Sequence, residues 1–184
     1  EYEKIGYCYS YDMLGEAART AEDADRYFAV YQHALQKIGE CANSMSAHRK
    51  PSISVKLSAL HPRYEFAKRQ RILSELVPKV LSLAQQAKAC DIDLHIDAEE
   101  ANRLDIMLDV FEQVYQDSSL QGWTGLSLAL QSYLKAAYCV IDWLAALSKK
   151  HGRKINIRLI KGAYWDSEIK ESQEWGLSSF PVFT

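Results

Sequence analysis

Five short apolar runs alternate with longer amphipathic stretches, and this alternation constrains the fold more than any other feature of the sequence. The runs have the length and composition of buried strands and occupy residues 7–14, 52–60, 91–97, 125–131 and 155–160. The stretches between them repeat apolar residues every three or four positions, which is typical of helices, in residues 17–38, 69–90, 101–115 and 134–147. Gly152 follows the last of these and is a suitable helix stop.

Strands that alternate with helices predict a parallel sheet with right-handed crossovers. The starts of the predicted strands are separated by 45, 39, 34 and 30 residues. An eight-unit barrel of about 250 residues has roughly 31 residues in each unit, so a barrel with some insertions fits this spacing. An open, doubly wound sheet fits the alternation as well.

Polar residues follow the predicted strands, and their position favours the barrel. In a (β/α)8 barrel the chemistry lies at the carboxyl ends of the strands. The residues found at or near these ends are Asp12, Glu16, Lys56, Asp97, Glu99, Glu100, Gln131, Arg158 and Lys161. We therefore predict an α/β fold, a partial (β/α)8 barrel of about five of eight units. Residues 1–184 are expected to be the amino-terminal part of a longer barrel.

Lys56 and Arg158 lie within apolar runs, where an unpaired charge is costly to bury. One interpretation is a structural ion pair in which either residue contacts Asp97 on a neighbouring strand. The other is a polar pocket that uses both signs of charge. His95, within the third run, is either a core histidine with a satisfied hydrogen bond or part of that pocket.

Composition argues against several classes of function. The 22 basic and 24 acidic residues give a net charge of −2, so nothing favours nucleic acid as a partner of this segment. No apolar run is long enough to span a membrane. The sequence contains neither GxGxxG nor GxxxxGK, which argues against a Rossmann or P-loop nucleotide site.

The four cysteines are widely scattered and do not form a metal-binding motif. Cys8, Cys41, Cys90 and Cys139 include no C-x2-C pair, so no metal site is predicted. Reduced thiols in a cytoplasmic protein are the expectation.

Four segments together resemble the proline dehydrogenase family, and most closely its form in bifunctional bacterial proteins of the proline utilization A type. They are SYDMLGEA (10–17), ISVKLSALHPRY (53–64), IDAEE (96–100) and IRLIKGAYWDSEIK (157–170). The resemblance implies FAD-dependent oxidation of L-proline to 1-pyrroline-5-carboxylate, with hydride transfer to flavin N5 and electrons passed to membrane quinone. Relatives of this type also carry aldehyde dehydrogenase and DNA-binding modules and can associate peripherally with membranes.

The resemblance also implies roles for individual residues. Lys56 matches the residue that meets the substrate carboxylate, and Tyr164 one that lines the substrate pocket. Glu16 matches a carboxylate that supports an arginine of the substrate site. Asp97 and Arg158 match the active-site acid and arginine. Positions that contact FAD are matched by Gln131, Arg158, Lys161, Gly162, Ala163, Trp165 and Thr184.

These implied roles are chemically coherent. Proline is a zwitterion, and the compact charge of Lys56 suits its carboxylate. A permanently charged, planar arginine such as Arg158 suits the negative charge that accumulates on a reduced flavin. Nothing in the sequence matches the family's last helix with its pair of substrate-binding arginines. An isolated 184-residue chain is therefore expected to bind FAD poorly and to be inactive.

Two alternatives remain open from the sequence. Lysines on the strands of a barrel are also typical of lyases and aldolases, in which Lys56 or Lys161 would form a Schiff base with a carbonyl substrate. The other alternative is a non-catalytic remnant of an enzyme.

Overall fold

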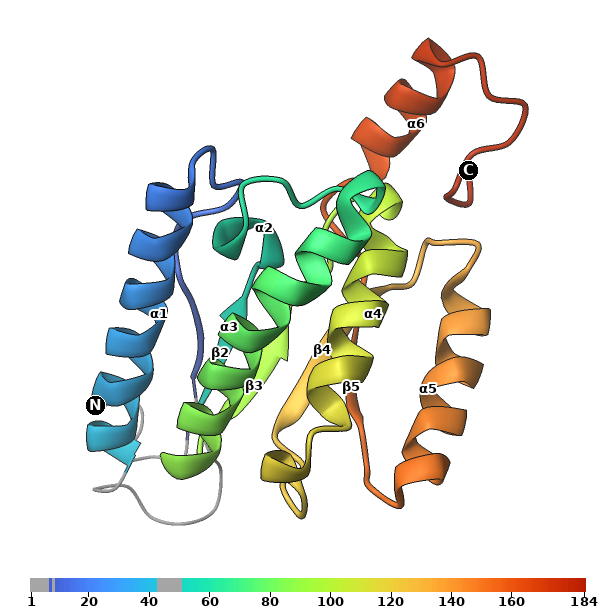
Figure 1. Cartoon of the computed structure of the whole chain (residues 1–184). Coiled ribbons are helices and arrows are strands. Elements are labelled where there is room, and N and C mark those ends of the chain that lie inside the picture. Colours follow the sequence, from blue (N-terminus) through green and yellow to red (C-terminus); the bar gives the residue numbers. More distant parts are fainter. Residues whose placement is uncertain (1–6, 8, 43–50) are drawn as a thin grey trace.

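A single parallel sheet of five strands organises the chain, as the computed structural model shows (Figure 1). The structure describes residues 7, 9–42 and 51–184; Cys8 lies outside the described residues. Each strand pairs with the next one in chain order, and every pair is parallel. The strands are β1 (Ser10–Asp12), β2 (Ser52–Val55), β3 (Asp93–Ile96), β4 (Leu126–Gln131) and β5 (Asn156–Ile160).

The four long helices cover one face of this sheet (Figure 1). They are α1 (Ala21–Ala42), α3 (Arg69–Ala89), α4 (Leu104–Tyr115) and α5 (Ala137–His151). A doubly wound sheet would carry helices on both faces and would change strand order at a switch point. Sequential strand order with helices on one side is the arrangement of a barrel wall, and the predicted partial (β/α)8 barrel is confirmed.

Alternation along β2, β3 and β4 separates an apolar face from a polar one. The side chains of Ile53, Val55, Leu94, Ile96 and Leu128 are fully buried and belong to the core that the helices complete. Each such side chain contributes roughly 1.5–3 kcal/mol through its removal from water. The main apolar core of the described chain therefore lies between the sheet and its helices.

The opposite face of the sheet carries polar side chains, whereas most barrel interiors are filled by branched apolar residues. The register aligns Asp12 with Ser54, Ser54 with His95, and His95 with Ser127. One layer nearer the carboxyl ends, Ala129 aligns with Arg158. Since all strands run in the same direction, the residues that follow them meet at one end of the sheet.

Two segments differ from the sequence prediction. Residues 57–60 were expected to continue the second strand but form the short helix α2 (Leu57–Leu60), because the amide of Ala59 bonds to the carbonyl of Lys56. The first strand is shorter than predicted, with three residues. Helix α1 begins only after Thr20, whose hydroxyl accepts the amide of Asp23 while the Asp23 carboxylate accepts the Thr20 amide.

The carboxyl-terminal part contains one unpredicted helix, α6 (Trp165–Glu174). Short 3-10 turns occur at Phe66–Lys68, Ala101–Arg103 and Ser118–Leu120. The predicted stop after α5 is confirmed, since Gly152 adopts a left-handed conformation with a φ of 59°. Within the described part of the chain, no helix combines the length and apolar character needed to cross a membrane.

Arg153 fixes the start of β5 to the end of α4, at the amino-terminal end of the sheet. Its Nη1 donates to the carbonyl of Leu120 at 2.7 Å, and its Nη2 donates to the carbonyl of Tyr115. The guanidinium also lies 3.7 Å from the centre of the Tyr115 ring. This clamp is at the opposite end of the sheet from the polar strand ends.

Candidate functional site

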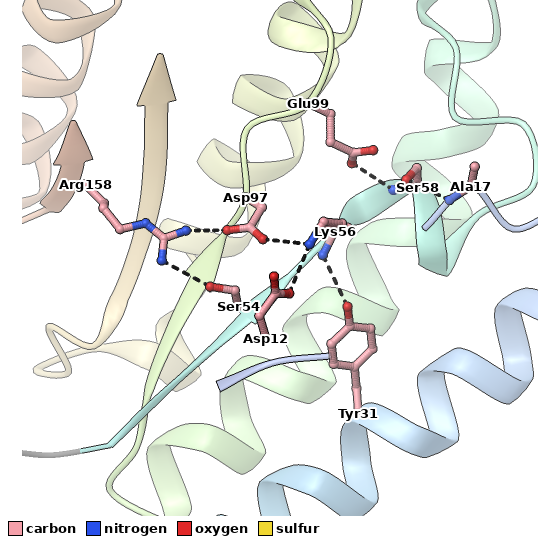
Figure 2. Close-up of polar contacts among 9 residues, drawn as sticks. All are labelled: Asp12, Ala17, Tyr31, Ser54, Lys56, Ser58, Asp97, Glu99 and Arg158. Carbon is pink, nitrogen blue, oxygen red and sulfur yellow. Dashed lines mark hydrogen bonds and ion pairs between the residues drawn. The ribbon is translucent and has the colours of Figure 1, made fainter. Parts of the chain in front are cut away.

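Two cations converge on one carboxylate at the carboxyl ends of the strands (Figure 2). Asp97, directly after β3, contacts Lys56 with one oxygen at 3.2 Å and Arg158 with the other. The Asp97 side chain is 12% exposed, against 18% for Lys56 and 38% for Arg158. The ion pair with Asp97, one of the two sequence interpretations, is therefore present, and it involves both cations at once.

Ser54 and Asp12 extend this cluster across two more strand positions. The second terminal nitrogen of Arg158 donates to the Ser54 hydroxyl at 3.2 Å. Asp12, the last residue of β1, accepts from the Lys56 ammonium at 3.0 Å. One connected network thus joins a side chain from each of β1, β2 and β5 with the side chains of the residues just after β2 and β3.

The local structure holds Lys56 in a charged state. Burial alone would lower its pKa, but hydrogen bonds and charges from Asp12 and Asp97 outweigh burial and raise the pKa above its usual value. The Lys56 amide donates to the Tyr31 hydroxyl of α1 at 3.4 Å. Tyr31 is almost fully buried, and this burial raises its pKa to about 12, so it remains a neutral phenol.

Glu99 connects the loop after β3 with helix α2. Its carboxylate accepts the Ser58 amide at 3.0 Å and the Arg103 guanidinium at 2.9 Å. Burial raises the pKa of Glu99. The Ser58 hydroxyl in turn accepts the Ala17 amide at 3.0 Å (Figure 2), which fixes the chain next to the exposed Glu16.

The loop after β5 forms a second part of this end of the sheet. Gly162 has a φ of 93°, and a Cβ there would overlap the ring of Tyr133. The Tyr133 hydroxyl accepts the Tyr164 amide at 3.2 Å. Burial, followed by the nearby acidic residues, raises the pKa of Tyr164 to about 12. The turn is thus held close to β4 by a contact that needs glycine.

The other residues singled out from the sequence differ in their surroundings. Gln131 is buried, and its Nε2 donates to the backbone carbonyl of Glu99 at 3.1 Å. Trp165 is 40% exposed and donates its indole N–H to the carbonyl of Phe183 at 2.8 Å. The remaining three, Lys161, Ala163 and Thr184, are exposed.

His95 lies on the polar face of the sheet, in register with Ser54 of the cluster. Its Nδ1 forms a hydrogen bond with the Ser127 hydroxyl. Burial and then the positive charge of Arg158 lower its pKa. His95 is therefore a half-buried histidine with a hydrogen-bond partner, as one of the two sequence interpretations expected.

Sequence reasoning missed three members of the network. Asp12 was noted at a strand end but received no role, and no role in the site was predicted for Ser54 or Tyr31. Ser54 had a usable signal, because it precedes Lys56 by two positions and so shares its face of the strand. Tyr31 had none, since its spacing in a helix is typical of core packing.

Comparisons with known proteins find relatives over the whole chain. The sequence profile described as proline dehydrogenase matches residues 1–184. The bifunctional protein PutA of Salmonella typhimurium is 50% identical over 182 residues, which are 99% of this chain and 14% of the relative. PutA of Rhizobium meliloti is 47% identical over 184 residues, 100% of this chain and 15% of the relative.

Solved structures give the same result. A crystal structure of Bradyrhizobium japonicum PutA superposes with a TM-score of 0.92 at 55% identity, over 96% of this chain and 18% of that one. PutA from Bdellovibrio bacteriovorus shares the fold with a TM-score of 0.93 at 22% identity, over 100% of this chain and 20% of that one. The chain thus spans at most about a fifth of the length of these relatives. By its matching profile, its identity to PutA proteins and its fold, the chain belongs to the proline dehydrogenase family.

Proposed function

We propose that the intact protein containing this chain oxidises L-proline to 1-pyrroline-5-carboxylate, with FAD as cofactor and membrane quinone as electron acceptor. The observation that carries this proposal is the cluster of Lys56, Asp97 and Arg158 at the strand ends of a proline dehydrogenase family member. The name bifunctional for its relatives supports a parent protein with a second, fused activity, such as an aldehyde dehydrogenase module.

Lys56 is the proposed ligand of the proline carboxylate. Its ammonium group has three donors, and two of them face Asp12 and Asp97. Because its raised pKa keeps it charged, it offers a fixed positive charge to an incoming carboxylate. Tyr164 would line the pocket for the proline ring, and Glu16 would support a substrate-binding arginine contributed by another part of the protein.

The residues near β5 fit a flavin. Arg158 leaves 38% of its side chain exposed while Asp97 and Ser54 hold its direction, so a permanent positive charge is presented in a defined orientation. Trp165 offers a half-exposed aromatic face and Lys161 a second cation. Residues proposed to hold FAD are Gln131, Arg158, Lys161, Gly162, Ala163, Trp165 and Thr184.

The chemistry that FAD supplies when bound is acceptance of a hydride from the carbon beside the proline nitrogen. The contribution of this chain is alignment and electrostatics. Lys56 fixes the carboxylate end of the substrate. Arg158 stabilises negative charge on the cofactor side. Asp97 supports both of these roles, because it contacts Lys56 and Arg158 and holds the two cations in one geometry.

A Schiff-base mechanism is less well supported. A lysine must lose its proton before it can attack a carbonyl group. Asp12 and Asp97 raise the pKa of Lys56 and so disfavour the neutral amine that this reaction needs.

Product analysis tests the proposal. The full-length protein should convert proline into a cyclic imine that an aromatic aminoaldehyde traps, with one quinone reduced for each imine formed. The Lys56→Met variant should require far more proline for the same rate. Capture of a lysine–substrate adduct by borohydride, without quinone reduction, would contradict the proposal and support the lyase alternative.

A further inference from the structure

We infer that Asp12 competes with the substrate carboxylate for the ammonium group of Lys56, and that this competition weakens carboxylate binding. The inference rests on the proposed function, since it assumes that Lys56 binds a carboxylate ligand. It assigns to Asp12 a part in setting substrate affinity.

The two carboxylates that contact Lys56 are held very differently (Figure 2). Asp97 has two cationic partners, Lys56 and Arg158, and its side chain is only 12% exposed. Asp12 is 61% exposed, and in the described part of the chain Lys56 is its one ion-pair partner. Asp97 is therefore a fixed part of the network, whereas Asp12 can leave it.

Displacement of Asp12 requires little energy. An ion pair with a mostly exposed partner contributes little to stability, because water competes for the charge and the side chain loses freedom in the pair. The Asp12 carboxylate can turn into solvent while the contact between Lys56 and Asp97 remains. An incoming carboxylate would then receive the same ammonium donor that Asp12 had used.

Charge balance favours replacement over addition. Lys56 and Arg158 carry two positive charges, and Asp12 and Asp97 carry two negative ones. A substrate carboxylate that entered beside Asp12 would leave an excess negative charge, and Glu16 on the neighbouring loop adds another. Exchange of one carboxylate for the other on Lys56 avoids two competing carboxylates on one ammonium group, because the exposed Asp12 can turn its charge into water.

The Asp12→Asn variant tests the inference in the flavin-loaded, full-length protein. The probe is tetrahydrofuran-2-carboxylate, which has the ring and carboxylate of proline but no amine to oxidise. Its dissociation constant, measured by calorimetry, should fall about two- to five-fold, the range expected for loss of one competing exposed ion pair. The KM for proline should fall in the same direction.

Two controls separate competition from other effects. Asp25→Asn removes a similarly exposed carboxylate from a half-buried lysine, Lys79. The two side chains contact each other at 2.7 Å, away from the strand ends. This variant should bind the probe as the unmodified protein does. The uncharged probe tetrahydrofuran-2-carboxamide should gain no affinity in Asp12→Asn.

Unchanged or weaker binding of the carboxylate probe by Asp12→Asn would overturn the inference, since Asp12 would then be a support for Lys56. A gain for both probes would overturn it too, because the effect would not depend on the carboxylate. If the unmodified protein oxidises proline in either case, the proposed function stands. If it neither oxidises proline nor binds the carboxylate probe, both proposals fail.

Discussion

The substitution Asp97→Asn should loosen the carboxyl end of the sheet, because it leaves Lys56 and Arg158 without their shared counter-charge. Asp97 is 12% exposed, so water replaces the lost charge poorly. Asparagine keeps the size of the side chain and removes its negative charge. The change therefore isolates the electrostatic part of the contact.

The size of the effect follows from the exposure of the three partners. Loss of one member of a buried ion pair costs about 3–5 kcal/mol. Two features reduce this cost: Arg158 is 38% exposed to water, and Lys56 keeps its ion pair with Asp12. We expect about 2–3 kcal/mol, which corresponds to a roughly 30- to 150-fold rise in the local opening equilibrium at about 1.4 kcal/mol for each factor of ten.

Hydrogen exchange resolved by peptide measures this opening within the full-length protein. Amides of β3 and β5 should exchange faster by that factor in Asp97→Asn. Asp25→Asn, which breaks a more exposed pair with Lys79, should change exchange less than about two-fold. Equal exchange of β3 and β5 in Asp97→Asn and the unmodified protein would refute the reasoning, because Asp97 would then not hold the two cations.

Three further predictions concern other parts of the chain. Burial and Arg158 lower the pKa of His95 below 6.5, so the folded state binds its proton less readily and stability should decline as the pH falls below about 6.5. His95→Gln should flatten this decline in thermal unfolding between about pH 5 and 8; an unchanged slope would contradict it. Gly162→Ala should lower stability by more than Gly122→Ala, since both glycines have positive φ but a Cβ only at Gly162 meets another side chain. Equal losses, measured by thermal unfolding, would show that Tyr133 does not restrict the turn. Arg153→Met should cost about 3 kcal/mol through loss of two charged hydrogen bonds, seen as faster amide exchange at the end of α4; unchanged exchange would rule out the clamp.

The fold was largely predictable because its pattern is local. Alternating apolar runs and helical repeats located all five strands and the four long helices. The errors came from chain geometry that apolar content does not encode. Residues 57–60 are as apolar as a strand, yet the chain turns after Lys56 into a helix that reaches the Ala17 loop. Helix α6 was missed since its sequence is mostly polar.

The candidate site was predictable only in part. Charges within apolar runs drew attention to Lys56 and Arg158, and the strand ends predicted that Asp97 would lie near them. Tyr31 carries no such signal, because a tyrosine in a helix is ordinary, and Ser54 carries only a weak one, its place on the same strand face as Lys56. Their contacts join residues far apart in sequence, 104 positions for Ser54 and Arg158. Only the assembled sheet brings them together.

The absorbance spectrum of the full-length protein, recorded before and after anaerobic addition of proline, tests the central claim most directly. The account predicts a yellow flavin spectrum that proline bleaches, with bleaching strongly weakened in Lys56→Met. A protein without flavin absorbance would contradict the account, as would bleaching at the same proline concentrations after Lys56 is replaced.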